Sequence, residues 1–399
     1  MTGKRVVITG VGPVSAIGIG RDAFFEALKN GHSGIGPVAA FSTDRLTSKL
    51  AAEVRGFDVR EYLETEKAYL DRASQLAFAA MSLALEDGNL NLKEMDRSAI
   101  GLILGSAVGC LESASLFFGD FLEKGPRFVK PIIFPHTYAN TTISLLAIEY
   151  GLDGYHLNFA SGVTSSASAL LHAYDRIRAG RNPLVLAGGV DALSPLLYEG
   201  YERAGRLSPH DGGGVEACSP FDAAHNGAVL GEGAGLLVLE EWEHARQRGT
   251  RIYGEISGGG AYGDTMARAM RAACRDLPGG VADLDYISAA ANGSRALDRA
   301  ETRALREALG ESAGNVPVSS VKPLLGEVLG ADGALRTIAA LGAMETGFVP
   351  PTLNLKQPDG AEPLNRVRDQ GINRAVSKAL VNSIDPGGNA VSLLLTKRE

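Results

Sequence analysis

Residues 155–180 have the composition and spacing of a turn that could hold a nucleophile. An apolar run at 157–160 enters a turn of small residues at 161–166, and a helical pattern then continues until Gly180. A strand, a tight turn and a helix in this order direct one side chain and the first helical N–H groups to a common point, where they stabilise negative charge. The residue at the centre of the turn is Val163, which has neither a lone pair nor an acidic proton and cannot form an acyl-enzyme.

Other side chains could serve as a nucleophile instead of Val163. Ser161, Thr164 and Ser165 are hydroxyls of the same turn, and Cys110 is a thiol elsewhere in the chain. Each would need a base within reach, and none of the seven histidines lies in a catalytic motif. A hydrolase or acyltransferase that uses Ser161, Thr164 or Cys110 therefore stays open as an alternative. A small buried thiol is the simpler role for Cys110.

The elements that must position this turn alternate between strands and helices. Residues 100–107 and 183–188 are apolar runs of the kind buried in a parallel sheet, and residues 70–86 repeat apolar positions at helical spacing. This rhythm indicates parallel strands joined by right-handed helical crossovers. The rhythm restarts later in the chain, so we expect an α/β protein with two similar halves, residues 1–250 and 251–399, packed as one unit.

The N-terminal segment ITGVGPVS resembles a dinucleotide-binding turn only in part. We predict a short buried strand at residues 5–9 and a loop at 11–20, with Gly10 and Gly12 after the strand. The third glycine of the dinucleotide fingerprint is replaced by Ser15, and no acidic residue closes a second strand about twenty positions later. We therefore expect no nucleotide cofactor.

The composition is that of a globular protein of a reducing compartment. Of 399 residues, 45% are hydrophobic and 21% are charged, and 39 basic against 46 acidic residues give a net charge of −7. This balance offers no basic surface for nucleic acid. The three cysteines lack metal-ligand spacing, no apolar run is long enough to span a membrane, and residues 1–20 lack the apolar segment of a secretory signal. We expect a cytoplasmic protein without a metal, a cofactor, or a membrane or nucleic-acid partner.

Over nearly its full length the chain resembles the β-ketoacyl-acyl carrier protein synthases of the thiolase fold. The segments that carry the resemblance are KRVVITGVGPVSAIG (4–18), AGGVDA (187–192), SPFDAAHNGAVLGEGAGLLVLEEWEHA (219–245), VSSVKPLLG (318–326), PPTLN (350–354) and VNSIDPGGN (381–389). Their order and spacing together are specific, although no single segment is decisive. The resemblance implies a thiolase-like five-layer αβαβα architecture made of two duplicated halves.

The resemblance also assigns the chemical positions, and this chain departs from the family at each of them. The family's cysteine, which carries the acyl chain as a thioester, corresponds to Val163. The histidine of one family motif corresponds to Asn292, which forms hydrogen bonds but has no pKa useful for acid–base catalysis. The histidine of another corresponds to Glu327, whose charge would repel a developing enolate or oxyanion. The lysine of that second motif is retained as Lys322, and we expect it to pair with Glu327 or Glu301 in a structural role.

A fourth departure concerns the oxyanion hole. In the family, one of its two N–H donors comes from the aromatic residue of a Gly-Phe-Gly-Gly loop, and Pro386 stands at that position here. Proline has no N–H to donate, and the loss of one donor costs about 3 kcal/mol of transition-state binding. With Val163, Asn292, Glu327 and Pro386 at these positions, we expect no catalytic residues of the ketosynthase type.

Type II polyketide systems contain a silent ketosynthase homologue, the chain-length factor, which pairs with an active ketosynthase. The resemblance therefore implies a heterodimer in which this chain completes the polyketide tunnel and limits the number of malonyl units condensed on acyl carrier protein. Its expected partners are the active ketosynthase, acyl carrier protein and the polyketide intermediate. Family chain-length factors often carry glutamine where this chain has Val163, so a decarboxylating role in priming is in doubt. A homodimer that binds acyl-carrier conjugates stays open as a third interpretation.

The resemblance places one end of the tunnel on the helix expected after Cys110. Leu111, Ala114 and Phe118 are spaced at i, i+3 and i+7 and therefore share one helical face. If that face crosses the dimer interface, Phe118 acts as a floor and small Ala114 leaves depth, while Phe117 turns toward the protein's own core. The alternative is that Leu111 and Phe118 are simply interface core.

Overall fold

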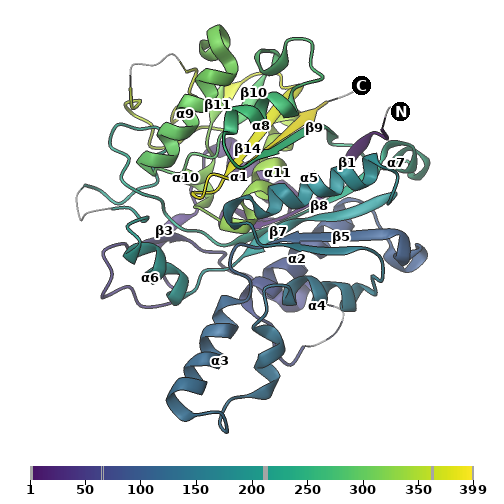
Figure 1. The fold of residues 1–399 in the computed structure, drawn as a ribbon, viewed down its shortest axis with the longest axis vertical. Coiled ribbons are helices and arrows are strands. Elements are labelled where there is room, and N and C mark those ends of the chain that lie inside the picture. Colours follow the sequence, from purple (N-terminus) through teal and green to yellow (C-terminus); the bar gives the residue numbers. More distant parts are fainter. Residues whose placement is uncertain (1–2, 64, 66, 210–213, 361–363, 398–399) are drawn as a thin grey trace.

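Ten strands from the two halves of the chain form the frame of the structure (Figure 1). The computed structural model describes residues 3–63, 65, 67–209, 214–360 and 364–397. The first half supplies β1 (Val6–Ser15), β5 (Ile100–Gly105), β6 (His156–Phe159), β7 (Leu184–Asp191) and β8 (Gly233–Glu241). The second half supplies β9 (Gly254–Tyr262), β10 (Tyr286–Ser288), β11 (Val318–Ser319), β14 (Lys378–Ile384) and β15 (Ala390–Thr396). Short strands outside this frame are β2 (Gly18–Ile19), β3 (Ile35–Pro37), β4 (Leu50–Ala52), β12 (Phe348–Val349) and β13 (Ile372–Asn373).

The two halves repeat one topology. The first runs in the order β6-β5-β7-β8-β1 and the second in the order β11-β10-β14-β15-β9. Corresponding neighbours also pair in the same sense: β5 is parallel to β6 and β7, as β10 is to β11 and β14. The remaining neighbours are antiparallel in both halves, and β1 pairs with β9 to join them. This correspondence confirms the predicted α/β class with duplicated halves, while the boundary at residue 250 stays a prediction.

Helices fill the layers between and outside these strands. The helices are α1 (Arg21–Asn30), α2 (Arg72–Asp87), α3 (Leu111–Lys124), α4 (Thr141–Tyr150), α5 (Ser165–Arg178), α6 (Pro195–Arg203), α7 (Trp242–Arg248), α8 (Met266–Ala273), α9 (Arg295–Leu309), α10 (Lys322–Leu325) and α11 (Asp332–Thr346). α5 and α11 contact strands of both halves, whereas α2 and α4 pack on the first half and α8, with α9 beside it, on the second. The order of layers is therefore αβαβα, as the resemblance implies.

The central helices have the composition that a position between two sheets requires. Every residue of α11 from Asp332 to Met344 is buried, as expected for a helix that is covered on all sides. α5 buries small and aliphatic residues, among them Ala169, Leu170 and Ile177. Small side chains allow the sheets to approach both helices closely. This close packing holds α5, and with it the N-terminus of α5, in a fixed position.

The N-terminal strand is longer than the sequence predicts. We expect a strand at 5–9 and a loop at 11–20, whereas β1 continues to Ser15 and pairs with β8 along this length. Gly10 and Gly12 face α2, and a Cβ on Gly10 would lie 2.5 Å from the carbonyl oxygen of Ala84. These glycines permit a close approach of strand and helix. The predicted loop is therefore wrong, because the glycines are packing residues rather than turn residues.

One helical segment stands apart from the layers. α3, together with the short 3₁₀ helix Pro131–His136 that follows it, extends from the lower end of the molecule as drawn (Figure 1). The exposed surface of this segment is largely apolar and is described below. Among the described residues, no helix combines the length and the apolar character that crossing a bilayer requires.

We expect Gly188→Ala to destabilise the protein, because its new Cβ would overlap the carbonyl oxygen of Gly235 on the neighbouring strand β8. The free energy of unfolding should fall by about 3 kcal/mol, measured by denaturant titration. Gly200→Ala in α6 is the control, because its Cβ meets nothing within 4 Å, and it should stabilise the protein by about 0.5–1 kcal/mol. Equal stabilities of Gly188→Ala and the wild type would contradict the close strand packing.

Candidate functional site

The turn predicted at 161–166 forms at the N-terminus of α5. β6 ends at Phe159, a short 3₁₀ helix spans Gly162–Thr164, and α5 begins at the next residue. Gly162 has a φ of +63°, a left-handed conformation that glycine adopts without a steric penalty. Val163 follows it and is 5% exposed. The backbone therefore has the form of a catalytic turn, while the side chain at its apex offers only methyl groups.

A cavity of about 420 Å³ lies beside this turn and brings together all four departing positions. Val163, Asn292, Glu327 and Pro386 line it, from segments far apart in the sequence. Apolar side chains such as Leu297 also line the cavity. The structure therefore brings together the four positions at which the chain departs from the family motifs, and their loss of catalytic roles stays a prediction.

The carboxylate of Asp385 occupies the space in front of Val163, a feature that sequence reasoning missed. Its Oδ2 accepts a hydrogen bond from the Val163 N–H at 3.3 Å, and its Oδ1 accepts one from the Gly387 N–H at 2.8 Å. The carboxylate also lies against Gly162, where any Cβ would overlap Oδ2. Asp385 thus takes the N–H that an acyl oxygen would need for stabilisation. The only signal in the sequence was an acidic residue beside Pro386.

Asn292 and Glu327 bind each other across the cavity wall. The Asn292 Nδ2 donates to Glu327 Oε2 at 2.8 Å, and the Lys322 Nζ donates to the same oxygen at 2.7 Å. Glu327 is 2% exposed, and within the described part of the chain its Oε1 has no hydrogen-bond partner. This group contains no imidazole, which is the side chain that exchanges protons most readily near neutral pH.

Lys322 belongs to a buried chain of alternating charges. Its Nζ lies 2.7 Å from Glu327 and 3.4 Å from Asp332, and Asp332 pairs with Arg336 at 2.6 Å. Burial alone would lower the pKa of Lys322, but Asp332 and Glu327 outweigh this effect and raise it. Burial would likewise raise the pKa of Asp332, but Arg336 and Lys322 lower it. Asp332 therefore favours the charged forms of Lys322 and Arg336, and these two cations favour the charged form of Asp332.

Of the two partners expected for Lys322, Glu327 and Glu301, the structure shows Glu327. Glu301 accepts hydrogen bonds from the N–H groups of Ala290 and Ala291 and from the Asn382 side chain. Burial raises the pKa of Glu301 despite these bonds. Asp332, four residues before Arg336 on α11, takes the place that we assigned to Glu301. No pattern in the sequence signals the contact of Lys322 with Asp332, because that contact depends on how α11 packs beside Lys322.

The hydroxyls near Val163 do not form a nucleophile–base pair in the part of the chain that the structure describes. Thr164 Oγ1 donates to the Ser161 carbonyl at 2.8 Å and lies 3.4 Å from Ser161 Oγ. Ser165 Oγ donates to the Gly162 carbonyl at 2.6 Å. These bonds hold the turn together and involve no histidine or carboxylate. The alternative of a hydrolase based on Ser161 or Thr164 therefore gains no support from the geometry.

The three cysteines are buried and free. Burial, with a smaller contribution from Asp71, raises the pKa of Cys110 to about 11, and burial raises the pKa of Cys274 to about 12. Burial also raises the pKa of Cys218. Thiols with such pKa values are almost entirely protonated at neutral pH and are poor nucleophiles. Within the described residues no group of three or more potential ligand side chains is arranged to bind a metal, and the expectation of no cofactor stays a prediction.

The three residues predicted at the tunnel or interface all lie on α3 but differ in environment. Leu111 is half-buried against the apolar cluster that contains Val163 and Leu193. Ala114 is half-buried. Phe118 is 54% exposed, and its neighbour Phe117 packs on Phe118 and on Phe134 with ring centroids 5.6 and 5.4 Å apart. The outward position of Phe118 allows a contact with another chain, and its role in a tunnel stays a prediction.

Exposed apolar side chains concentrate on and after α3. Eight of the twelve large hydrophobic side chains that are exposed among the described residues lie between positions 116 and 138. We call this set the α3 apolar face; it consists of Leu116, Phe118, Phe121, Leu122, Phe128, Ile132, Phe134 and Tyr138. Contiguous apolar surface of this kind marks a site of interaction in soluble proteins.

Comparison with known proteins identifies the family. Residues 3–245 match the family model for the beta-ketoacyl synthase N-terminal domain, and residues 254–356 match that for the C-terminal domain. A 3-oxoacyl-[acyl-carrier-protein] synthase 2 from Synechocystis sp. is 33% identical over 408 residues, which cover 99% of this chain and 98% of that protein. The chain therefore belongs to the β-ketoacyl synthase family.

Two solved structures also resemble this chain over its whole length. The ishigamide ketosynthase/chain length factor matches with a TM-score of 0.92 and 29% identity, and covers 100% of both chains. The AntDE:AntF structure, a type II PKS acyl-carrier protein in complex with its ketosynthase bound to the hexaketide, matches with a TM-score of 0.88 and 27% identity, covering 99% of this chain and 100% of that one. The solved structures that resemble this chain therefore include a ketosynthase/chain length factor and a type II PKS ketosynthase in complex with its acyl-carrier protein.

We expect Lys322→Met to destabilise the protein strongly, because Glu327 would lose the one ion pair that it forms among the described residues, and Asp332 would keep only its pair with Arg336 there. Removing one partner of a buried ion pair costs about 3–5 kcal/mol, and urea titration measures this loss. The double variant Lys322→Met/Glu327→Gln should recover part of it. Lys124→Met, which removes an exposed pair with Asp120, is the control and should leave stability unchanged. An equally stable Lys322→Met variant would contradict the charge network.

We expect Val163→Cys to remain inactive in decarboxylative condensation, because Asn292, Glu327 and Asp385 still surround the new thiol. Asp385 should also raise the pKa of that thiol and slow its alkylation by iodoacetamide. The double variant Val163→Cys/Asp385→Gly should react about tenfold faster, since a shift of one pKa unit changes the thiolate fraction by that factor. Intact-protein mass spectrometry measures both rates. Condensation by Val163→Cys alone would contradict this account.

Proposed function

We propose that this chain is a chain-length factor: a subunit that does not condense acyl groups itself but pairs with an active ketosynthase and limits the length of its product. The observation that carries the proposal is the cavity beside α5, where Val163, Asn292, Glu327 and Pro386 meet. The Asp385 carboxylate also accepts a hydrogen bond from the Val163 N–H. These groups leave the site without a nucleophile at its apex and with carboxylates where a condensing enzyme stabilises negative charge.

The α3 apolar face supports the proposed heterodimer. Its eight side chains project from the layered body on one segment, and covering them with a partner would remove a large apolar surface from water. The similarity to the ishigamide ketosynthase/chain length factor supports an active ketosynthase as that partner. The similarity to a ketosynthase in complex with its acyl-carrier protein supports acyl carrier protein as a second partner.

Phe118 is our candidate for the floor of the tunnel, with Ala114 providing depth and Leu111 anchoring the helix. Leu111 packs against the cluster that contains Val163, so the helix is held to the site at one end. Phe118 lies two turns further along α3 and is exposed. In the proposed heterodimer Phe118 meets the polyketide intermediate at the interface. Malonyl condensation then occurs on the partner ketosynthase, and we place the complex in the cytoplasm.

An active 3-oxoacyl-[acyl-carrier-protein] synthase is the second candidate, because curated relatives such as the Synechocystis protein carry that name. The contents of the cavity oppose it, since neither Val163 nor Asn292 can supply a nucleophile or a base. An acyltransferase or hydrolase on the same fold is opposed by the hydrogen bonds of Ser161 and Thr164 and by the raised pKa of Cys110. A homodimer that binds acyl-carrier conjugates remains as an outcome of the following test.

The proposal is tested by producing this chain with a ketosynthase and separating the products by size-exclusion chromatography with mass determination. The ketosynthases are those of the organism that makes this chain and, as a related probe, the ketosynthase of the ishigamide pair. We expect a 1:1 heterodimer that extends malonyl-acyl carrier protein only when both subunits are present. A homodimer that ignores every ketosynthase, or condensation by this chain alone, would overturn the proposal.

We expect Phe118→Ala to lengthen the polyketide made by the heterodimer, because removing the ring deepens the proposed tunnel. Mass spectrometry of the released products measures the change. Ile148→Ala in α4 is the control, because Ile148 is also an exposed large apolar side chain but lies outside the α3 apolar face. Identical products from Phe118→Ala and the wild type would show that Phe118 is interface core only.

A further inference from the structure

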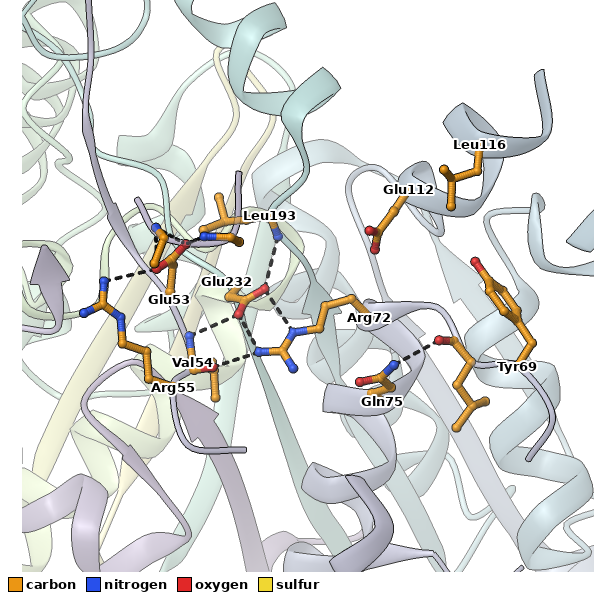
Figure 2. Close-up of a pocket in the computed structure, with 13 residues that line it drawn as sticks. Glu53, Val54, Arg55, Tyr69, Arg72, Gln75, Glu112, Leu116, Leu193 and Glu232 are labelled. Carbon is orange, nitrogen blue, oxygen red and sulfur yellow. Dashed lines mark hydrogen bonds and ion pairs between the residues drawn. The ribbon is translucent and has the colours of Figure 1, made fainter. Parts of the chain in front are cut away.

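A second hollow, of about 700 Å³, lies beside the α3 apolar face (Figure 2). It is bordered by the N-terminal turn of α2, the first turns of α3, and the segment of β4 and the residues after it. Apolar and aromatic side chains supply part of its wall, among them Tyr69, Leu116 and Leu193. Five charged side chains complete it: Glu53, Arg55, Arg72, Glu112 and Glu232. This hollow is separate from the cavity that contains Val163.

Four of these five charges are already paired within the chain. Arg72 binds Glu232 at 2.8 Å, and Arg55 binds Glu53 at 3.1 Å. Glu232 also accepts from the N–H groups of Val54 and Leu193 at 3.1 and 3.4 Å, and Glu53 accepts from two backbone N–H groups near Ala39. These contacts fix both carboxylates in place. The Glu53 and Glu232 carboxylates therefore have few lone pairs left to accept hydrogen bonds from a ligand.

Glu112 is different, because no hydrogen bond or ion pair of its carboxylate is found among the described residues, although Arg72 lies close enough to attract it. Figure 2 shows it pointing from α3 into the hollow, with no contact drawn to Arg72 or to any other residue. Burial raises the pKa of Glu112, with further contributions from Asp71 and Glu232 that exceed the opposing effect of Arg72. The local potential at Glu112 is therefore negative. A cation placed beside it would be stabilised.

The hollow is continuous with the α3 apolar face. Leu116 belongs to that face and also lines the hollow, one helical turn after Glu112. A partner that covers the apolar face would therefore cover the mouth of the hollow and remove Glu112 from water. An uncompensated carboxylate in that position opposes association, whereas a carboxylate paired with a cation does not.

The chemistry of the hollow selects among possible occupants. A hydrocarbon chain would desolvate the Glu112 carboxylate without pairing it, and an acidic side chain would be repelled by Glu112. A lysine or arginine side chain fits, because its aliphatic stem can pack along Tyr69 and Leu116 while its charged end reaches Glu112. We propose that the hollow receives a basic side chain of the partner ketosynthase, which pairs with Glu112 when the heterodimer forms. This inference rests on the proposed function.

The test measures the dissociation constant of the heterodimer for three variants, with the ketosynthase of the host organism and that of the ishigamide pair as probes. Glu112→Gln keeps the shape of the side chain and should raise the dissociation constant about tenfold, and Glu112→Lys, which places like charges together, about a hundredfold. Glu123→Gln, an exposed carboxylate on the same helix that does not line the hollow, is the matched control and should change it less than about twofold. Thermal unfolding of each free variant confirms that it folds.

Salt adds a second readout. Raising sodium chloride should weaken the wild-type heterodimer, and Glu112→Gln should show a smaller dependence on salt because one charge pair is missing. A heterodimer that forms with the same dissociation constant in the wild type, Glu112→Gln and Glu112→Lys would overturn this inference and leave the proposed function intact. Absence of any heterodimer would overturn both. If this chain instead forms a homodimer, and Glu112→Gln weakens that homodimer, the assignment of a ketosynthase as the partner would be overturned.

Discussion

The close packing of α5 between the strands of the two halves is the constraint on which the site depends. A Cβ on Gly333 of α11 would come within 2.8 Å of the Ala167 backbone and side chain, and one on Gly105 of β5 would overlap the backbone at Ser165. These contacts fix the first turn of α5 whatever side chain stands at position 163. The backbone of this turn therefore does not depend on the side chain at position 163, because the packing of α5 holds it in place.

The polar groups around that turn form a consistent set. Replacing a neutral imidazole by the buried carboxylate of Glu327 would be costly unless a cation neutralised it, and Lys322 does so at 2.7 Å. Asp385 satisfies the N–H of Val163, which would otherwise be left without a partner beside an apolar side chain. These two contacts neutralise the charge at Glu327 and satisfy the N–H at Val163 within the chain itself.

Much of this organisation could be predicted from the sequence, because most elements have strong local patterns. The strand at β5, the helices α2 and α5 and the meeting of Val163, Asn292, Glu327 and Pro386 follow from apolar periodicity and from the family motifs. Asp385 could not be predicted, since its contact with Val163 joins residues 222 positions apart through the turn between β14 and β15. The full length of β1 was missed because Gly10 and Gly12 have the composition of a loop. The pairing of Lys322 with Asp332 depends on how α11 folds back, which no local pattern specifies.

The central claim is that this chain supports condensation without carrying the acyl group itself. Intact-protein mass spectrometry of the heterodimer, after incubation with an acyl-acyl carrier protein thioester, tests it most directly. The account predicts that the ketosynthase gains the mass of the acyl group while the mass of this chain is unchanged. An acyl adduct on this chain that turns over to product when malonyl-acyl carrier protein is added would contradict it.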